Sequence, residues 1–196
     1  MVIQTIEDIE NLIIEDKWMM DILKVAQQLE LPDWWICAGF VRSKIWDTLH
    51  GYNEKTPLAD IDVIYFNPHN KEESEEKKWE DQLQKLRPNI PWSVKNQARM
   101  HRINNLPPYK SSEDGISNFP ETVTAIGVKL NDQNEIVVVA PHGIVDILQM
   151  TVKPVPRFAT NKELLEIYEQ RIHRKNWHSI WPNISISNSK MWQKVH

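Results

Sequence analysis

The sequence predicts an α/β (α+β) domain in which a mixed sheet is flanked by helices. Short apolar runs typical of strands alternate with amphipathic helical segments along the first hundred residues, and a hairpin pattern follows at residues 124–141. A long helical pattern comes near the end of the chain. The 196 residues fit one domain. We assign residues 1–150 to its core and residues 151–196 to a C-terminal helix and basic tail packed on that core.

The predicted helices have apolar residues at three- and four-residue spacing. The first region, before Pro32, holds one helix or two, and the second helix ends at Gly51. Asn161 is a suitable N-cap for the last predicted helix. The predicted helices cover residues 5–31, 40–51, 71–86, 97–103, 143–150 and 161–177.

The predicted strands are short apolar runs rich in β-branched residues. A polar turn joins the last two as a hairpin, and the Pro-, Ser- and Gly-rich segment 106–115 is predicted to be a loop. The predicted strands cover residues 34–38, 60–66, 90–96, 124–130 and 135–141, and residues 151–156 are expected to be extended.

Composition narrows the class of protein. Cys37 is the single cysteine, so no internal disulfide can form, and a reducing cytoplasm is the expected location. The sequence shows no signal peptide and no apolar run long enough to span a membrane. The formal net charge is -4. Residues 151–196 carry eight Lys and Arg against three Glu, leaving 15 basic and 24 acidic residues in the core, so the basic end is a solvated helix face or a contact for a phosphate-bearing ligand.

Two aspartates open the strand "DIDVIYF". Asp60 and Asp62 are one residue apart, so in a strand they point to the same face. Carboxylates at the edge of a buried strand need a positive partner, either a salt bridge or a metal ion.

A phosphate site is predicted about twenty residues upstream. The strand "WWICA" ends at Gly39 and turns into a helix whose free N–H groups and dipole favour an anion. Gly39 lets phosphates approach the backbone, and Arg42 can add a planar fork of donors. Two carboxylates beside a triphosphate favour Mg²⁺, or Mn²⁺ in its place.

These motifs resemble the polymerase-β-type nucleotidyltransferase superfamily. "ICAGFVRSKIWD" followed by "LADIDVIYF" is similar to its head, with a G-x-x-R turn closest to that of tRNA CCA-adding enzymes. The similarity to a family of small bacterial nucleotidyltransferase-like proteins spans roughly residues 15–182. It is carried by "WSVKNQARMH", "FPETVTAIGV", "VVAPHGIVDIL" and "RKNWHSIWP".

The resemblance implies a polymerase-β-like fold, an NTP substrate and two-metal transfer with Asp60 and Asp62 as catalytic metal ligands. Gly39, Arg42 and Ser43 are the expected substrate-binding residues of the turn.

The sequence departs from the superfamily at two positions. Phe40 replaces a small residue after the glycine, and Ser93 lies on the strand that often carries a third carboxylate. Glu121 and Asp146 are the substitutes for that carboxylate elsewhere in the chain.

Several donors lie at and just after the end of the strand at residues 90–96. Asn96, Gln97, Arg99 and His101 either bind base, sugar or acceptor, or cap the next helix and pair with an acid. Cys37, inside an apolar strand, is expected to be buried filler. The tryptophans near the basic end, Trp177 and Trp181, are expected to pack the last helix on the domain rather than to stack bases.

Three functions remain open from the sequence. The first is a Mg²⁺-dependent enzyme that moves a nucleoside monophosphate from an NTP to a small-molecule or protein acceptor and releases pyrophosphate. Nucleic acid is a less favoured acceptor because the core is acidic. The alternative is a catalytically weak or inactive nucleotide-binding module, which Phe40 and Ser93 favour. In the third, Asp60 and Asp62 are salt-bridge partners of Arg42 and Lys44 in a structural protein.

Overall fold

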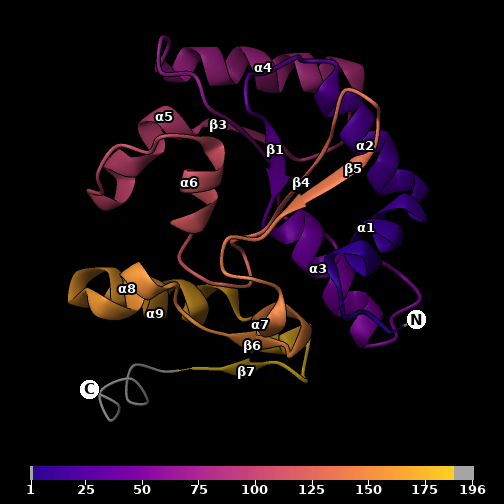
Figure 1. Ribbon diagram of the computed structural model, residues 1–196, viewed down its shortest axis with the longest axis vertical. Helices are drawn as coiled ribbons and strands as arrows, with labels where there is room; N and C mark the ends of the chain where they lie inside the picture. Colours follow the sequence, from indigo (N-terminus) through magenta and orange to yellow (C-terminus); the bar gives the residue numbers. More distant parts are fainter. Residues whose placement is uncertain (1, 188–196) are drawn as a thin grey trace.

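A five-stranded mixed sheet forms the centre of the protein, in a computed structural model that describes residues 2–187 (Figure 1). The strand order is β3-β2-β1-β4-β5, in which β2 and β3 are parallel and the other neighbours are antiparallel. The predicted mixed sheet is confirmed. Its strands are β1 (Trp35–Cys37), β2 (Ile61–Tyr65), β3 (Trp92–Asn96), β4 (Gly127–Leu130) and β5 (Ile136–Val139). A separate parallel pair consists of β6 (Thr151–Val152) and β7 (Ser185–Ile186).

Helices pack around this sheet. The first two contact β5 and β4, and the charged α4 contacts β3. The α-helices are α1 (Ile6–Ile14), α2 (Lys17–Gln27), α3 (Gly39–Leu49), α4 (Glu73–Leu86), α5 (Gln97–Met100), α6 (Ser112–Ser117), α7 (Val145–Leu148), α8 (Pro156–Thr160) and α9 (Lys162–Lys175). The 3₁₀ turns are η1 (His101–Asn104) and η2 (Trp177–Ser179). None of the helices among the described residues has the length and apolar character needed to cross a membrane.

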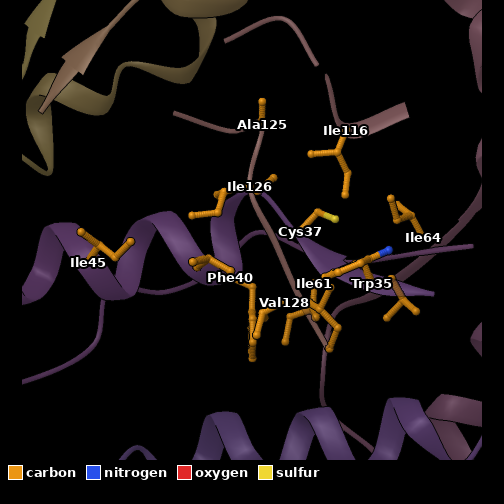
Figure 2. Packing of buried hydrophobic residues seen from close by; sticks show 14 of the residues in the cluster. Trp35, Cys37, Phe40, Ile45, Ile61, Ile64, Ile116, Ala125, Ile126 and Val128 are labelled. Atoms are coloured by element: carbon orange, nitrogen blue, oxygen red, sulfur yellow. The ribbon is translucent and has the colours of Figure 1, made fainter. Parts of the chain in front are cut away.

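The core lies between the sheet and the helices. Figure 2 shows Phe40, from the first turn of α3, in one cluster with Ile61 and Val128. Cys37 is fully buried in β1 and burial raises the pKa of its thiol, so the prediction of a buried filler is confirmed. Packing of this kind fixes the strand ends that carry the polar residues.

Two local predictions needed the structure. The first helical region is two helices, because the Asp16 side chain accepts hydrogen bonds from the backbone N–H groups of Trp18 and Met19 and begins α2. The prediction of a loop at residues 106–115 is wrong in its second half, where α6 begins at Ser112. Ser111 caps this helix by accepting a hydrogen bond from the Asp114 backbone N–H, a short capping signal that the Pro-rich composition masked.

The C-terminal segment packs against α3. Trp177 and Trp181 are buried and lie edge-on to Trp46, with ring centroids 5.7 and 5.2 Å away, which confirms their predicted packing role. Asn161 caps α9 as predicted, accepting a hydrogen bond from Leu164 N–H. Residues 188–196, the end of the predicted basic tail, lie outside the described residues.

Candidate active site

The turn between β1 and α3 exposes the beginning of the helix. Ala38 caps α3 in a positive-φ conformation (φ 55°), and no side chain caps the free N–H groups of the first turn. At Gly39, a Cβ would lie 3.6 Å from Nη2 of Arg42, so the guanidinium reaches back over this turn. Phe40 is 2 % exposed and packs against Trp18, with ring centroids 5.9 Å apart. Its bulk therefore lies in the core and leaves the anion-binding end of α3 open.

The two aspartates line one pocket with this turn. Asp60 is exposed just before β2, and Asp62 is the second residue of that strand and only partly exposed. The pocket has a volume of about 290 Å³. We call it the cationic pocket; the polar side chains and glycine that line it are Gly39, Arg42, Ser43, Asp60, Asp62, Arg171 and Lys175.

Burial sets the electrostatics of Asp62. It raises the pKa of this carboxyl to about 6, and the neighbouring Asp60 adds to the rise. A hydrogen bond from Ser93 and the charges of Arg171 and Lys175 act in the opposite direction. Two carboxylates that repel each other in this way favour a cation between them.

The residues present fit a hard metal ion. Mg²⁺ is usually held by one or two carboxylates, with phosphate oxygens and water as the other ligands. Among residues 2–187, no group of three or more His, Cys, Asp and Glu side chains is arranged to hold a metal. Asp60 and Asp62 would therefore bind a metal ion together with a phosphate-bearing ligand that supplies further oxygen ligands.

Arg42 is a buried cation surrounded by aromatic rings. Its guanidinium carbon lies 4.3 Å from the ring centroid of Trp177, 5.3 Å from that of Trp46 and 5.5 Å from that of Trp181. Burial lowers its pKa to about 10. Within the described chain it forms no salt bridge: its Nε is buried without a hydrogen bond, and Nη2 donates to Ser43 at 3.4 Å. Such a group has donors available for an anion in the pocket.

Helix α9 contributes two further cations that were not among the predicted site residues. Arg171 Nε donates to Glu121 Oε1 at 2.6 Å, and its guanidinium also lines the pocket. Lys175, one turn later, forms no salt bridge with any residue that the structure describes. The excess of basic residues after position 150 was the signal, but only the fold shows which of them reach the aspartates.

Two of the other predicted donors, Asn96 and Arg99, have protein partners. Arg99 makes two hydrogen bonds to the fully buried Glu76, Nε to Oε1 at 2.7 Å and Nη2 to Oε2 at 2.6 Å. Asn96 caps α5 and donates from Nδ2 to the carbonyl oxygens of Asn67 and Asn70, both at 2.8 Å. These contacts hold β3, α4 and the loop after β2 together.

Gln97 and His101 lie in a different setting. His101 is buried against Tyr109, with ring centroids 5.9 Å apart, and burial lowers the pKa of its imidazole. Gln97 lines a second pocket of about 220 Å³, which shares Ala38, Asp62 and Arg171 with the cationic pocket. We call it the amide pocket; its other walls are Ile64, Lys95, Gln97, Met100, Ile103, Asn104, Tyr109, Asn118, Phe119 and Pro120.

The structure also places the candidates for a third carboxylate. Ser93 lies directly opposite Asp62 in the parallel β2–β3 register, so no acid stands at that position. Glu121 is fully buried, where it binds Arg171 and accepts a hydrogen bond from Thr124 at 2.6 Å. Asp146 is paired with Lys153 at 2.6 Å.

Comparison with known proteins decides the family. The sequence matches the model of a family described as Nucleotidyltransferase over residues 24–186. The chain belongs to this nucleotidyltransferase family. A solved protein whose NMR structure reveals a CCA-adding enzyme head domain is 35% identical, with a TM-score of 0.84, over 95% of this chain and 97% of that one. The predicted polymerase-β-type fold is therefore confirmed. No curated protein matches this sequence.

More distant solved structures share the fold of this nucleotidyltransferase. A CCA-adding enzyme in complex with CTP is 12% identical, with a TM-score of 0.58, over 95% of this chain and 45% of that one. A tRNA nucleotidyltransferase complexed with a primer tRNA and an incoming ATP analogue is 14% identical, with a TM-score of 0.53, over 88% and 49%. The chain thus spans slightly less than half the length of these enzymes.

Proposed function

We propose that the protein is a Mg²⁺-dependent nucleotidyltransferase that moves a nucleoside monophosphate from an NTP to an acceptor and releases pyrophosphate. Mn²⁺ can replace Mg²⁺ in such an oxygen site. The observation that carries the proposal is the cationic pocket, where two carboxylates face the open end of α3 and three cationic side chains. The single, buried Cys37 suits a reducing cytoplasm, where we place the reaction.

Each wall of the pocket has a separate task. The free N–H groups of α3, Arg42 and Lys175 bind the triphosphate, whose charge matches theirs. Asp60 and Asp62 would hold the metal, which supplies charge neutralisation and alignment of the reacting oxygens when bound. Arg171, fixed on one side by Glu121, presents its remaining donors between the phosphates and Asp62.

Lys44 does not pair with either aspartate of the cationic pocket, which contradicts part of the competing salt-bridge hypothesis. Lys44 pairs with Asp16 at 2.8 Å rather than with Asp60 or Asp62. The hypothesis that these aspartates are structural partners of Arg42 and Lys44 is therefore wrong for Lys44. A ligand that carries both phosphate and metal accounts for the aspartates and for Arg42 at once.

One observation favours a second candidate, a nucleotide-binding module without transfer activity. The superfamily often uses a third carboxylate on the strand next to the D-x-D strand, and Ser93 occupies the position opposite Asp62. Such a module would bind Mg²⁺ and NTP in the same pocket and release no pyrophosphate. Binding and turnover therefore have to be measured separately.

The test combines both measurements on Asp62→Asn. We expect the wild-type protein to bind Mg²⁺ and NTP and to release pyrophosphate when a fractionated cell extract supplies acceptors, whereas release by Asp62→Asn falls about 10³-fold. Asp132→Asn, at an exposed position in the hairpin turn, is the matched control and should behave as wild type. Equal pyrophosphate release by Asp62→Asn and wild type would refute the mechanism. Metal-dependent binding without release in any fraction would establish the module instead.

A further inference from the structure

The amide pocket differs from the cationic pocket in its chemistry, although the two share Asp62 and Arg171. Its walls come from β2, β3, α5, η1 and the segments around α6. Figure 1 shows β3, α5 and α6 above α9. We infer that this pocket binds the acceptor of the reaction, and that the acceptor is a small uncharged alcohol with an apolar body. This inference rests on the proposed function and names the substrate that the proposal leaves open.

The assignment of the amide pocket to the acceptor follows from the geometry of phosphoryl transfer. The attacking and leaving oxygens lie roughly in line through the phosphorus atom. A triphosphate bound to Arg42, Lys175 and the end of α3 directs its leaving pyrophosphate into the cationic pocket. The attacking oxygen then comes from the opposite side of the phosphorus beside Asp62, and the amide pocket opens on Asp62 from the side of β3 and α5.

The cations of the amide pocket are already neutralised. Lys95 lies 3.5 Å from Glu76 and 3.6 Å from Glu80, and Arg171 is paired with Glu121. An anionic acceptor would find Lys95 paired and the remaining donors of Arg171 engaged by the phosphates, and a cationic acceptor would have only Asp62, which the metal needs. A charged group in this pocket would lose its hydration without compensation, which is costly. An uncharged ligand avoids that cost.

The remaining walls suit an apolar body with a few hydrogen-bonding groups. Ile64, Met100 and Phe119 provide apolar surface, and Ile103 stands 65% exposed at the rim. An exposed isoleucine at a pocket is a contact for apolar ligand surface.

Gln97 provides the main polar contact of the pocket. Gln97 is 3% exposed and its side-chain amide makes no hydrogen bond within the described residues, so both its N–H donors and its carbonyl oxygen are available to a ligand. Gly115 makes room for this amide, because a Cβ at Gly115 would lie 2.5 Å from Gln97 Oε1. The absence of that Cβ leaves the space that the amide occupies.

Size and charge argue against a long nucleic acid in the pocket. A volume of about 220 Å³ is below that of a drug-sized ligand site. Nucleic-acid binding also draws most of its affinity from cations that neutralise successive phosphates. Since both cations of the pocket are paired with buried or half-buried carboxylates, a chain of phosphates gains little here.

The step balances without a further reactant. The hydroxyl oxygen of the acceptor attacks the α-phosphorus and forms the new P–O bond while the bond between the α-phosphorus and the bridging oxygen breaks. Pyrophosphate leaves with that electron pair, and the hydroxyl proton passes to solvent. The product is the nucleoside monophosphate ester of the alcohol.

The inference is tested by NMR titration of the full ¹⁵N-labelled protein with three probes of one shape: benzyl alcohol, benzoate and benzylamine. In the presence of Mg²⁺ and a non-hydrolysable ATP analogue, we expect benzyl alcohol to shift the Gln97 and Asn104 side-chain amides with a dissociation constant of order 1 mM. Benzoate and benzylamine should bind at least about ten-fold more weakly, because each must bury a charge.

Variants separate the pocket from the rest of the fold. Ile103→Asp puts a charge at the rim, and Val145→Asp is its matched control on α7, since Val145 is 60% exposed and lines neither pocket. Ile103→Asp should abolish the benzyl alcohol shifts and leave the ATP analogue bound, whereas Val145→Asp should change neither. Gly115→Ala should displace the Gln97 amide and lower the affinity for benzyl alcohol several-fold, while the affinity for the ATP analogue stays unchanged.

Each remaining result has one meaning. Analogue binding with no response of the amide pocket to benzyl alcohol overturns the inference and leaves the proposed function standing. Shifts of Gln97 and Asn104 caused by the adenine of the analogue alone assign the pocket to the nucleobase, and also overturn it. Failure of the cationic pocket to bind the analogue refutes the proposed function itself, and the acceptor role with it.

Discussion

Arg42 and Arg99 are both candidate ligand-binding arginines from the sequence, Arg42 in the predicted phosphate turn and Arg99 with pairing to an acid left open, and the structure gives them opposite surroundings. Arg99 makes two hydrogen bonds to the buried carboxylate of Glu76. Arg42 is more deeply buried, yet it has tryptophan rings in place of a carboxylate, and its Nε has no hydrogen bond. The first arginine has its partner within the protein, and the second has donors left for a ligand.

We use this difference to separate polar residues that hold the fold together from candidate ligand-binding residues. Leaving a buried donor unpaired costs free energy, so a fold tolerates it where a ligand later provides the partner. The cationic pocket has this character at Arg42 and at the uncapped end of α3. The cluster of Asn96, Arg99 and Glu76 is saturated. Substitutions that alter one of these two clusters at a time therefore distinguish a ligand-binding role from a structural one.

The largest expected effect is on turnover in Asp62→Asn. Loss of the carboxylate removes several kcal/mol of charge stabilisation, and each 1.4 kcal/mol is worth ten-fold, so pyrophosphate release should fall about 10³-fold. Adding EDTA to the wild-type protein should have a comparable effect. Initial rates of pyrophosphate release measure both, and turnover that persists in EDTA would contradict metal dependence.

The second effect is on stability in Arg99→Gln. This change leaves Glu76, which is fully buried, without its two charged hydrogen bonds, and removing one partner of a buried pair should cost about 2–4 kcal/mol. Urea unfolding measures the loss. Affinity for Mg²⁺ and NTP should be unchanged under conditions where the variant is folded, and a large loss of affinity there would place Arg99 in the ligand site.

The third effect is on nucleotide affinity in Arg42→Gln. A hydrogen bond to a charged group contributes about 1.5–3 kcal/mol, so affinity for NTP should fall roughly 10- to 100-fold. Arg42→Lys keeps the charge and loses the planar fork, and it should fall in between. Calorimetric titration measures the three proteins, and equal affinity in all of them would show that Arg42 is an ordinary core residue.

The fourth effect is a gain of stability in Asp62→Asn that depends on pH. In the folded protein the pKa of Asp62 is raised from 3.8 to about 6, mainly by burial, so its charged form destabilises the fold. Wild-type stability is therefore lost as pH rises from about 4 to 6. Without ligand, the variant should be about 1–2 kcal/mol more stable at pH 7, a value discounted for the partial exposure of Asp62, and equal to wild type below about pH 4. Unfolding at a series of pH values measures this, and a variant that is less stable at pH 7 would contradict it.

The smallest effect is expected from Lys175→Gln. Lys175 is a partly exposed cation at the cationic pocket, so its loss should lower the affinity for NTP only about two- to five-fold. The decrease should be smaller at high salt. Lys162→Gln, at the other end of α9, is the control and should have no effect. Titration at two salt concentrations measures the difference, and a salt-independent change would argue against a phosphate contact.

Local sequence rules predicted most of the sheet and the site at its edge. Strand and helix patterns predicted the strands β1 to β5 and most of the helices between them, and the turn at Gly39 with Asp60 and Asp62 was identified from spacing and resemblance. Helix α6 was missed because its cap, Ser111, lies in a segment whose composition indicates a loop. Local composition does not show which backbone groups a serine will cap.

The rest of the site depends on contacts between distant parts of the chain. Arg171 and Lys175 lie more than a hundred residues from Asp62, and the ring that stacks on Arg42 most closely is that of Trp177. Glu76, the partner of Arg99, lies in α4, whose sequence predicts only a charged, solvent-exposed helix. Whether a polar side chain has all its hydrogen-bond partners is a property of the packed fold, so the sequence alone left open whether Arg99 binds a ligand or pairs with an acid.

The most direct test is the affinity of Mg²⁺ and a non-hydrolysable NTP analogue for wild type, Arg42→Gln and Arg99→Gln, measured by calorimetry with and without the metal. We predict metal-dependent binding in wild type, a similar affinity in Arg99→Gln, and a loss of at least about ten-fold in Arg42→Gln. Full affinity in Arg42→Gln together with weakened binding in Arg99→Gln would contradict the assignment of the cationic pocket as the nucleotide site.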